Sequence, residues 1–205
     1  MIARLKGGEP LSPGGVFALD LEGDGNSPPT PVDLALVEIR DWNTTLGWRR
    51  WLFRPERPIS RMATSIHGIR NKDVEGAPNF ENSAQEIRSL VSGATVVGHN
   101  VRVDIDVLGR MLPGWQPNRA IDTLRLAKLL LPGRATYGLQ SLAKNYDLAE
   151  GLEEQCDSSA HTSAYDALLA ARLLFRLLEL RAPEDRKYLL SSASIIEEPR
   201  QGSLF

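Results

Sequence analysis

The chain has 205 residues, a hydrophobic content of 42% and a net charge of −2, which suit one compact domain with a tail. This charge does not indicate a long nucleic-acid footprint, which would usually carry a basic excess. A single cysteine, Cys156, excludes an internal disulfide framework. The chain has no segment of membrane-spanning length and no signal-like start, so we expect a cytoplasmic protein without a membrane partner.

The order of the expected elements predicts an α/β fold with a mixed central sheet of about five strands flanked by helices. Residues 1–14, rich in Gly and Pro, are expected to form a flexible arm, 15–182 the domain and 183–205 a flexible tail. The expected strands are 16–22, 32–39, 47–54, 94–98 and 119–122. The expected helical segments are 60–75, 82–91, 101–112, 123–131, 139–146 and 162–181.

Two acids lie in the first apolar run, Phe17-Ala18-Leu19-Asp20-Leu21-Glu22. Residues two apart in a strand point to the same face, so Asp20 and Glu22 present both carboxylates on one side. Such acids repel each other unless a positive charge lies between them. Carboxylate oxygens suit Mg²⁺ or Mn²⁺, although the pair alone is also consistent with two ordinary surface acids.

A third acid, Asp104, follows the short strand expected at 94–98. Apolar residues from Val101 to Leu112 have helical spacing, which places Asp104 in the first turns of a helix just beyond a strand end. Asp106 would point well away from Asp104, so only one of the two acids can face a site. Taken alone, Asp104 is explained as an acid favoured at the start of a helix.

A histidine and a fourth acid lie in Ala160-His161-Thr162-Ser163-Ala164-Tyr165-Asp166. His161 precedes a long apolar helical run, and Asp166 falls in its early part. Histidine titrates near neutral pH and can take a proton from water. A lone histidine at a helix start is more often a cap or a surface residue, but here it follows two carboxylate motifs.

These three segments, in this order, resemble the motifs of the DEDDh 3′→5′ exonucleases over about residues 16–178. The resemblance implies a ribonuclease H-like fold and stepwise hydrolysis of phosphodiester bonds from a 3′ end, with release of nucleoside 5′-monophosphates. It implies that four acids hold two Mg²⁺ or Mn²⁺ ions, and that His161 is the general base. The four acids are Asp20, Glu22, Asp104 and Asp166.

The resemblance also implies substrate contacts, at Leu21, Gly23, Asp24, His67 and Asn100. Gly23 and Asp24 depart from the family pattern, in which Thr-Thr or Thr-Gly usually follows the glutamate. Asp24 would therefore place an additional anion near a phosphate or add an outer ligand. The next strand carries Asp33, a shorter acid than the glutamate usual there, and Ser163 stands where alanine is usual.

Three functions remain open on the motifs. The first is a 3′→5′ exodeoxyribonuclease in replication proofreading or DNA repair, the second an exoribonuclease that trims RNA, and the third a non-catalytic adaptor for a polymerase or clamp. The two enzymes would share the same catalytic residues. The adaptor is disfavoured because no catalytic position has been lost.

The last residues, Gln201-Gly202-Ser203-Leu204-Phe205, resemble the peptide by which bacterial replication and repair proteins bind the sliding clamp. Leu204 and Phe205 would fill an apolar pocket, and Gln201 would add a polar contact. Gly202 departs from the larger residue usual there, and a chance match at a disordered end is the alternative. This tail favours DNA over RNA as the substrate.

Basic and aromatic residues concentrate in and after the third expected strand. Tryptophans can stack on single-stranded bases, but in strands they more often belong to the core or sheet surface. The arginines are equally consistent with a solvated strand and loop. The residues are Trp42, Trp48, Arg49, Arg50, Trp51, Arg54, Arg57 and Arg61.

Overall fold

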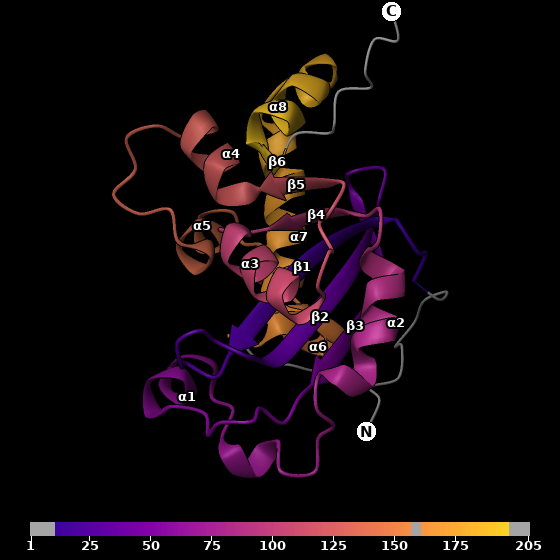
Figure 1. Cartoon of the computed structure of the whole chain (residues 1–205). Helices are drawn as coiled ribbons and strands as arrows, with labels where there is room; N and C mark the ends of the chain where they lie inside the picture. Colours follow the sequence, from indigo (N-terminus) through magenta and orange to yellow (C-terminus); the bar gives the residue numbers. More distant parts are fainter. Residues whose placement is uncertain (1–10, 157–160, 197–205) are drawn as a thin grey trace, which may run out of the picture.

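The computed structural model describes residues 11–156 and 161–196, and shows an α/β fold built on a mixed sheet (Figure 1). Six strands of this part of the chain form the sheet, in the order β3-β2-β1-β4-β5-β6. Their bounds are β1 Val16–Gly23, β2 Pro31–Arg40, β3 Thr44–Leu52, β4 Thr95–Gly98, β5 Arg119–Asp122 and β6 Ser194–Ile196. The α/β class expected from the sequence is confirmed.

Strand β1 lies in the interior of the sheet, antiparallel to β2 and parallel to β4. Strands β2 and β3 complete an antiparallel meander, β4 and β5 are parallel, and β6 is antiparallel to β5. A strand with neighbours on both sides and layers on both faces is apolar on both faces. In β1, Ala18 packs in one core cluster, and Phe17 and Leu19 pack in the other.

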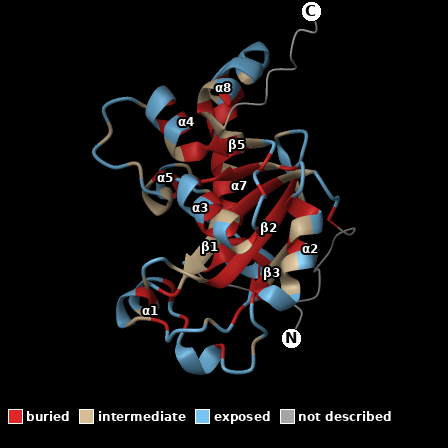
Figure 2. Cartoon of the chain, viewed as in Figure 1, coloured by how far each residue is buried: buried red, intermediate tan, exposed pale blue. Residues whose placement is uncertain are grey.

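Helices cover both faces of the sheet. Helix α7 packs on the face that carries Ala18, and α2 and α3 pack on the face that carries Leu19. Figure 2 shows the central strands and α7 as the most deeply buried parts of the molecule. The helices are α1 Arg61–His67, α2 Glu81–Val91, α3 Arg102–Met111, α4 Thr123–Leu130, α5 Leu139–Asn145, α6 Leu152–Cys156, α7 Ser163–Glu179 and α8 Arg186–Ala193.

Helix α7 is long because its sequence suits a buried helix. Alanine and leucine, both strong helix formers, dominate it, and its buried side chains occupy most of its circumference. The buried residues Ala164, Leu168 and Ala171 recur at helical spacing. Helix α7 therefore fixes Asp166, in its first turn, against the sheet.

The folded part of the chain extends beyond the domain expected from the sequence. Within residues 183–196, which were expected to be a flexible tail, the structure has helix α8 and strand β6. Burial of Leu189, Leu190 and Ala193 in the core that contains α7 stabilises this segment. The pairing of Ile196 with Ala120 adds the sixth strand. Helix α6 was also not expected, because five residues carry too little periodicity.

The end of the expected N-terminal arm packs on the domain. Leu11 is buried, and the backbone N–H of Gly14 donates to the carbonyl oxygen of Leu90 at 3.0 Å. Residues 1–10 lie outside the described part of the chain. Among the described residues, no helix combines the length and the apolar character that crossing a bilayer requires.

Candidate active site

Three carboxylates from two distant segments meet at one end of β1. Asp20 and Glu22 project from the β1 face that α7 covers, and Asp166 projects from the first turn of α7. One ligand oxygen from each of the three lies within 4.8 Å of the others. Asp20 and Glu22 lie on the same face of β1, as expected, and both therefore lie near Asp166.

Asp104 joins the second motif to the first. It is buried in the first turn of α3, and its Oδ1 accepts a hydrogen bond from the backbone N–H of Leu21 at 3.1 Å. Asp106, two residues later, is exposed. The expectation that only one of these acids faces inward is therefore confirmed. Asp104 is not part of the three-carboxylate group.

The carboxylates raise one another's pKa. Burial raises the pKa of Asp20 well above its usual range, and the charges of Asp104, Glu22 and Asp166 add to this effect. Burial and the charge of Asp166 raise the pKa of Glu22 to about 7. Burial also raises the pKa values of Asp104 and Asp166. The metal-free site therefore concentrates negative charge that its protein surroundings do not balance.

A divalent cation suits this group of acids. Oδ2 of Asp20 is buried and has no hydrogen-bond partner among the described residues. An orphaned, buried carboxylate oxygen is costly, and coordination to a cation would satisfy it. The donor set is all oxygen, which matches Mg²⁺ or Mn²⁺. The residues present therefore fit the metal dependence that the motifs imply.

His161 lies beside this group of acids. Its Nδ1 is 4.0 Å from Oδ2 of Asp166, and about half of its side chain is exposed. Its backbone is in the left-handed region, with φ of 63°, which is uncommon for a residue other than glycine. Because the imidazole is both open to solvent and next to a carboxylate, it can exchange a proton with a water molecule there.

His67 supports the loop after Glu22. Its Nδ1 accepts from the backbone N–H of Ile69 at 3.1 Å, so the ring hydrogen lies on Nε2, which donates to the carbonyl oxygen of Gly23 at 3.3 Å. Burial lowers the pKa of His67, which keeps it neutral. The structure thus places His67 and Gly23 together, beside the β1 end.

Asp24 is used within its own loop. Both its carboxylate oxygens accept hydrogen bonds from Asn26 and Thr30, at 2.7 to 3.1 Å, and its side chain is fully buried. Burial acts to raise the pKa of Asp24, but these hydrogen bonds outweigh it and lower the pKa. Asp24 therefore stabilises the turn after β1, rather than presenting a free anion to a phosphate.

Asn100 is exposed just beyond β4, with φ of 64°. Its backbone N–H donates to Oδ1 of Asp122 at 2.9 Å, which ties the end of β4 to the start of α4. Leu21, the other expected substrate contact, is half-buried and lies on the face of β1 opposite to Asp20 and Glu22. The expected clamp-binding residues Gln201, Leu204 and Phe205 lie outside the described residues.

Contacts of two side chains near the site were not predicted from the sequence. The amide of Gln140 donates to Oδ1 of Asp166 at 2.8 Å. Arg50 makes two hydrogen bonds to Asp33, so it does not belong to a solvated strand. Gln140 and Arg50 lie far from the motifs in sequence, and no local pattern indicated their contacts. By contrast, Trp48 and Trp51 are buried, as tryptophans in strands usually are.

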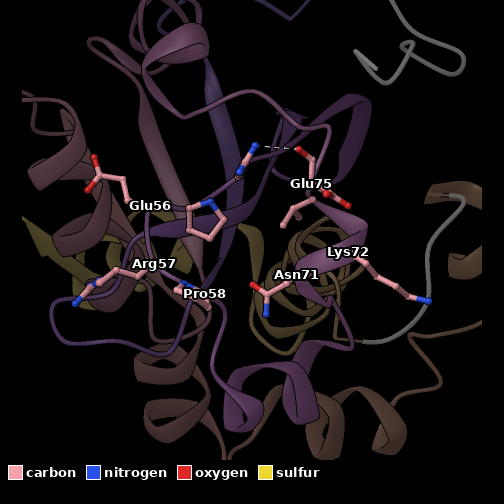
Figure 3. Close-up of a pocket in the computed structure, with 9 residues that line it drawn as sticks. Glu56, Arg57, Pro58, Asn71, Lys72 and Glu75 are labelled. Atoms are coloured by element: carbon pink, nitrogen blue, oxygen red, sulfur yellow. Dashed lines mark hydrogen bonds between the residues drawn. The ribbon is translucent and has the colours of Figure 1, made fainter.

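A separate cavity of about 400 Å³ lies among the loops that flank α1 (Figure 3). None of the five motif residues lines it. Figure 3 shows the side chains of Arg57 and Lys72 extending away from each other. The guanidinium of Arg54 donates to the backbone oxygen of Glu75 at 3.4 Å. The cations of this cavity therefore do not converge on a common ligand position.

The sequence profile described as Exonuclease matches residues 18–174, which include all five motif residues. The chain belongs to the exonuclease family. This exonuclease domain is 27% identical over 175 residues to 3′-5′ exonuclease DinG of Bacillus subtilis, covering 80% of this chain and 18% of that protein. It is 28% identical to DNA polymerase III subunit epsilon of Aquifex aeolicus, covering 85% of this chain and 86% of that protein.

A solved structure of Exonuclease X in complex with 5′ overhanging duplex DNA shares the fold, with a TM-score of 0.65 and 26% identity. The match covers 85% of this chain and 99% of that one. The chain spans 18% or less of the lengths of DinG and of the PolC-type polymerases that it matches.

Proposed function

We propose that the chain is a metal-dependent 3′→5′ exonuclease that hydrolyses phosphodiester bonds from the 3′ end of DNA and releases nucleoside 5′-monophosphates. The observation that carries this proposal is the convergence of Asp20, Glu22 and Asp166 within 4.8 Å, with His161 4.0 Å from Asp166. Four carboxylates and a base at one strand end suit two-metal hydrolysis, which needs cations on both sides of the scissile bond.

Each residue has a role in this proposal. Asp20, Glu22 and Asp166 would hold one Mg²⁺ or Mn²⁺ ion, and Asp20 together with Asp104 would support a second. Bound there, the ions would supply an acidified water molecule and charge stabilisation of the leaving 3′ oxygen. His161 takes the proton of the attacking water, and its exposure lets it pass that proton to solvent.

DNA is the proposed substrate because the names of two similar proteins refer to DNA. One is a DNA polymerase III subunit, and the other, Exonuclease X, was solved with duplex DNA. On the same similarities, we propose a role in replication proofreading or DNA repair. We also propose that the protein acts in the cytoplasm. RNA trimming remains the second candidate, since Asp20, Glu22, Asp104, Asp166 and His161 suit either nucleic acid.

The test uses matched DNA and RNA oligonucleotides, labelled at the 5′ end, with Mg²⁺ or Mn²⁺. We expect a ladder of products shortened from the 3′ end, release of nucleoside 5′-monophosphates, faster cleavage of DNA, and no cleavage in EDTA. Asp104→Asn should abolish cleavage, whereas Asp106→Asn, an exposed acid on the same helix, should leave it unchanged. Absence of cleavage of both strands with either ion would refute the enzyme and leave the adaptor.

We also propose that a sliding clamp binds the C-terminal residues Gln201, Leu204 and Phe205, with a polymerase as a further partner. The clamp proposal rests on the sequence resemblance alone. Deletion of residues 201–205 should abolish binding to a cognate clamp in surface plasmon resonance and should spare hydrolysis of free oligonucleotides. Equal clamp affinity of the full and shortened chains would discard the tail motif.

A further inference from the structure

Asp33 and Arg50 lie on the same face of the sheet as the catalytic acids. Directly paired residues in an antiparallel sheet share a face. Asp33 pairs with Glu22, so its side chain lies beside Glu22 on the face that α7 covers. Arg50 pairs with Ala35, which pairs with Asp20. Asp33 on β2 and Arg50 on β3 therefore lie on one face of the sheet with Glu22 and Asp20 of β1.

The two side chains form a bidentate ion pair. Nε of Arg50 donates to Oδ1 of Asp33 at 2.7 Å, and its terminal nitrogen donates to Oδ2 at 2.8 Å. Asp33 is fully buried, and the Arg50 side chain is 18% exposed. This planar, two-bond geometry holds the carboxylate in one orientation, as a lysine could not.

The oriented carboxylate also binds the start of α7. Oδ2 of Asp33 accepts the backbone N–H of Ser163 at 3.1 Å, across 130 residues of sequence. The first N–H groups of a helix have no acceptor within the helix and favour an anion. Asp33 therefore caps α7 from the sheet, so the position of the helix start depends on β2 and, through Arg50, on β3.

We propose that Asp33 and Arg50 are positioning residues, which fix the start of α7 so that Asp166 and His161 meet the acids of β1. Ser163 lies two residues after His161 and three before Asp166, so both depend on this anchor. An α-helix rises 1.5 Å per residue, which places the anchor within one turn of Asp166. This inference rests on the proposed function for its catalytic consequence, but its effect on metal binding does not require hydrolysis.

One test removes the N–H that Asp33 binds. Ser163→Pro deletes this donor at the first helical position, where proline is well tolerated. The preceding residue, Thr162, already has the extended backbone that proline requires, with φ of −117° and ψ of 148°. Ser163→Ala keeps the N–H and is the matched control.

A second test loosens the ion pair without removing its charge. Arg50→Lys loses the bidentate geometry. Its matched control is Arg176→Lys, in an exposed ion pair with Glu179 on α7 itself. Circular dichroism and thermal unfolding in EDTA establish that the metal-free variants fold. The Mn²⁺ concentration that gives half of the metal-induced rise in melting temperature then reports metal binding, independently of activity.

We expect Ser163→Pro and Arg50→Lys to raise this Mn²⁺ midpoint and to lower kcat by about 10- to 100-fold each, with KM for the oligonucleotide little changed. Ser163→Ala and Arg176→Lys should match the wild type. Folded test variants whose midpoints and kcat values stay within about twofold of their controls would overturn the inference. A wild type that binds Mn²⁺ but cleaves nothing would refute the proposed function alone, whereas the midpoint shift would still support the positioning role.

Discussion

Gln140 donates a hydrogen bond from its amide nitrogen to Oδ1 of Asp166, at 2.8 Å. This contact leaves Oδ2 of Asp166 on the side of His161, 4.0 Å from Nδ1. A neutral donor of this kind orients a carboxylate without competing for its charge, as do the outer hydrogen bonds around many metal ligands. Helix α5, which carries Gln140, therefore takes part in shaping the site.

Gln140→Leu should lower hydrolysis by about 10- to 100-fold, because Asp166 loses its orienting donor. The rate should be measured at saturating oligonucleotide, together with the Mn²⁺ midpoint from thermal unfolding. Asn145→Ala is the control, since its amide binds the carbonyl oxygen of Ser141 on the exposed side of the same helix. Full activity of Gln140→Leu would show that Asp166 holds its orientation without this contact.

His161→Gln should reduce kcat by about 10²- to 10⁴-fold, since glutamine cannot take a proton from water. His161 is not one of the three residues whose oxygens could hold a metal ion, Asp20, Glu22 and Asp166. The variant should therefore bind Mn²⁺ as the wild type does. Single-turnover kinetics over a pH series would check the role. A variant that keeps the wild-type rate would assign the proton transfer to another group.

Metal-free protein should become less stable as pH rises from about 4.5 to about 7. The pKa of Glu22 is raised from 4.5 to about 7 in the folded state, so in this range the folded chain retains a proton that the unfolded chain has released. The unfolded state then binds fewer protons, and the free energy of unfolding falls with pH. For Glu22 alone the loss is at most about 3 kcal/mol. Urea unfolding in EDTA across this range measures it.

Asp20→Asn is the control for this pH effect. It removes a second buried carboxyl group whose pKa burial raises, so the metal-free variant should be more stable than the wild type at pH 7 and should lose less stability with rising pH. The same variant should lose Mn²⁺ stabilisation and hydrolysis. A wild-type stability that is flat or rises between these pH values would contradict the raised pKa values of these buried acids.

Asp24→Ala should destabilise the chain by about 1–3 kcal/mol, because the part-buried donors of Asn26 and Thr30 lose the carboxylate that accepts from them. Because the pKa of Asp24 is lowered in the folded state, its contribution should be present near neutral pH and should fade as pH falls through the acid range. Urea unfolding at pH 7 checks the magnitude. A stable variant with a large change in KM would instead indicate direct contact with substrate.

The sequence by itself determined which of the site's side chains share a face. The two-residue period of a strand places Asp20 and Glu22 on one face, and the helical period turns Asp104 inward and Asp106 outward. These relationships are local, so they hold before any long-range contact forms. The same local patterns predicted the strands from β1 to β5 and the main helices, because their apolar periods are long or their bounds well marked.

The tertiary structure decided what surrounds those residues. Helix α8 and strand β6 form because residues 183–196 pack on α4 and pair with β5, although their own pattern is weak. Gln140, Asp33 and Arg50 reach the site through contacts that span 26, 130 and 17 residues of sequence. A lone glutamine or arginine carries no periodic signal that indicates its partner. Only the folded sheet and its helices bring Gln140, Asp33 and Arg50 within hydrogen-bonding range of their partners. The positions of Asp166 and His161 against β1 therefore depend on tertiary packing.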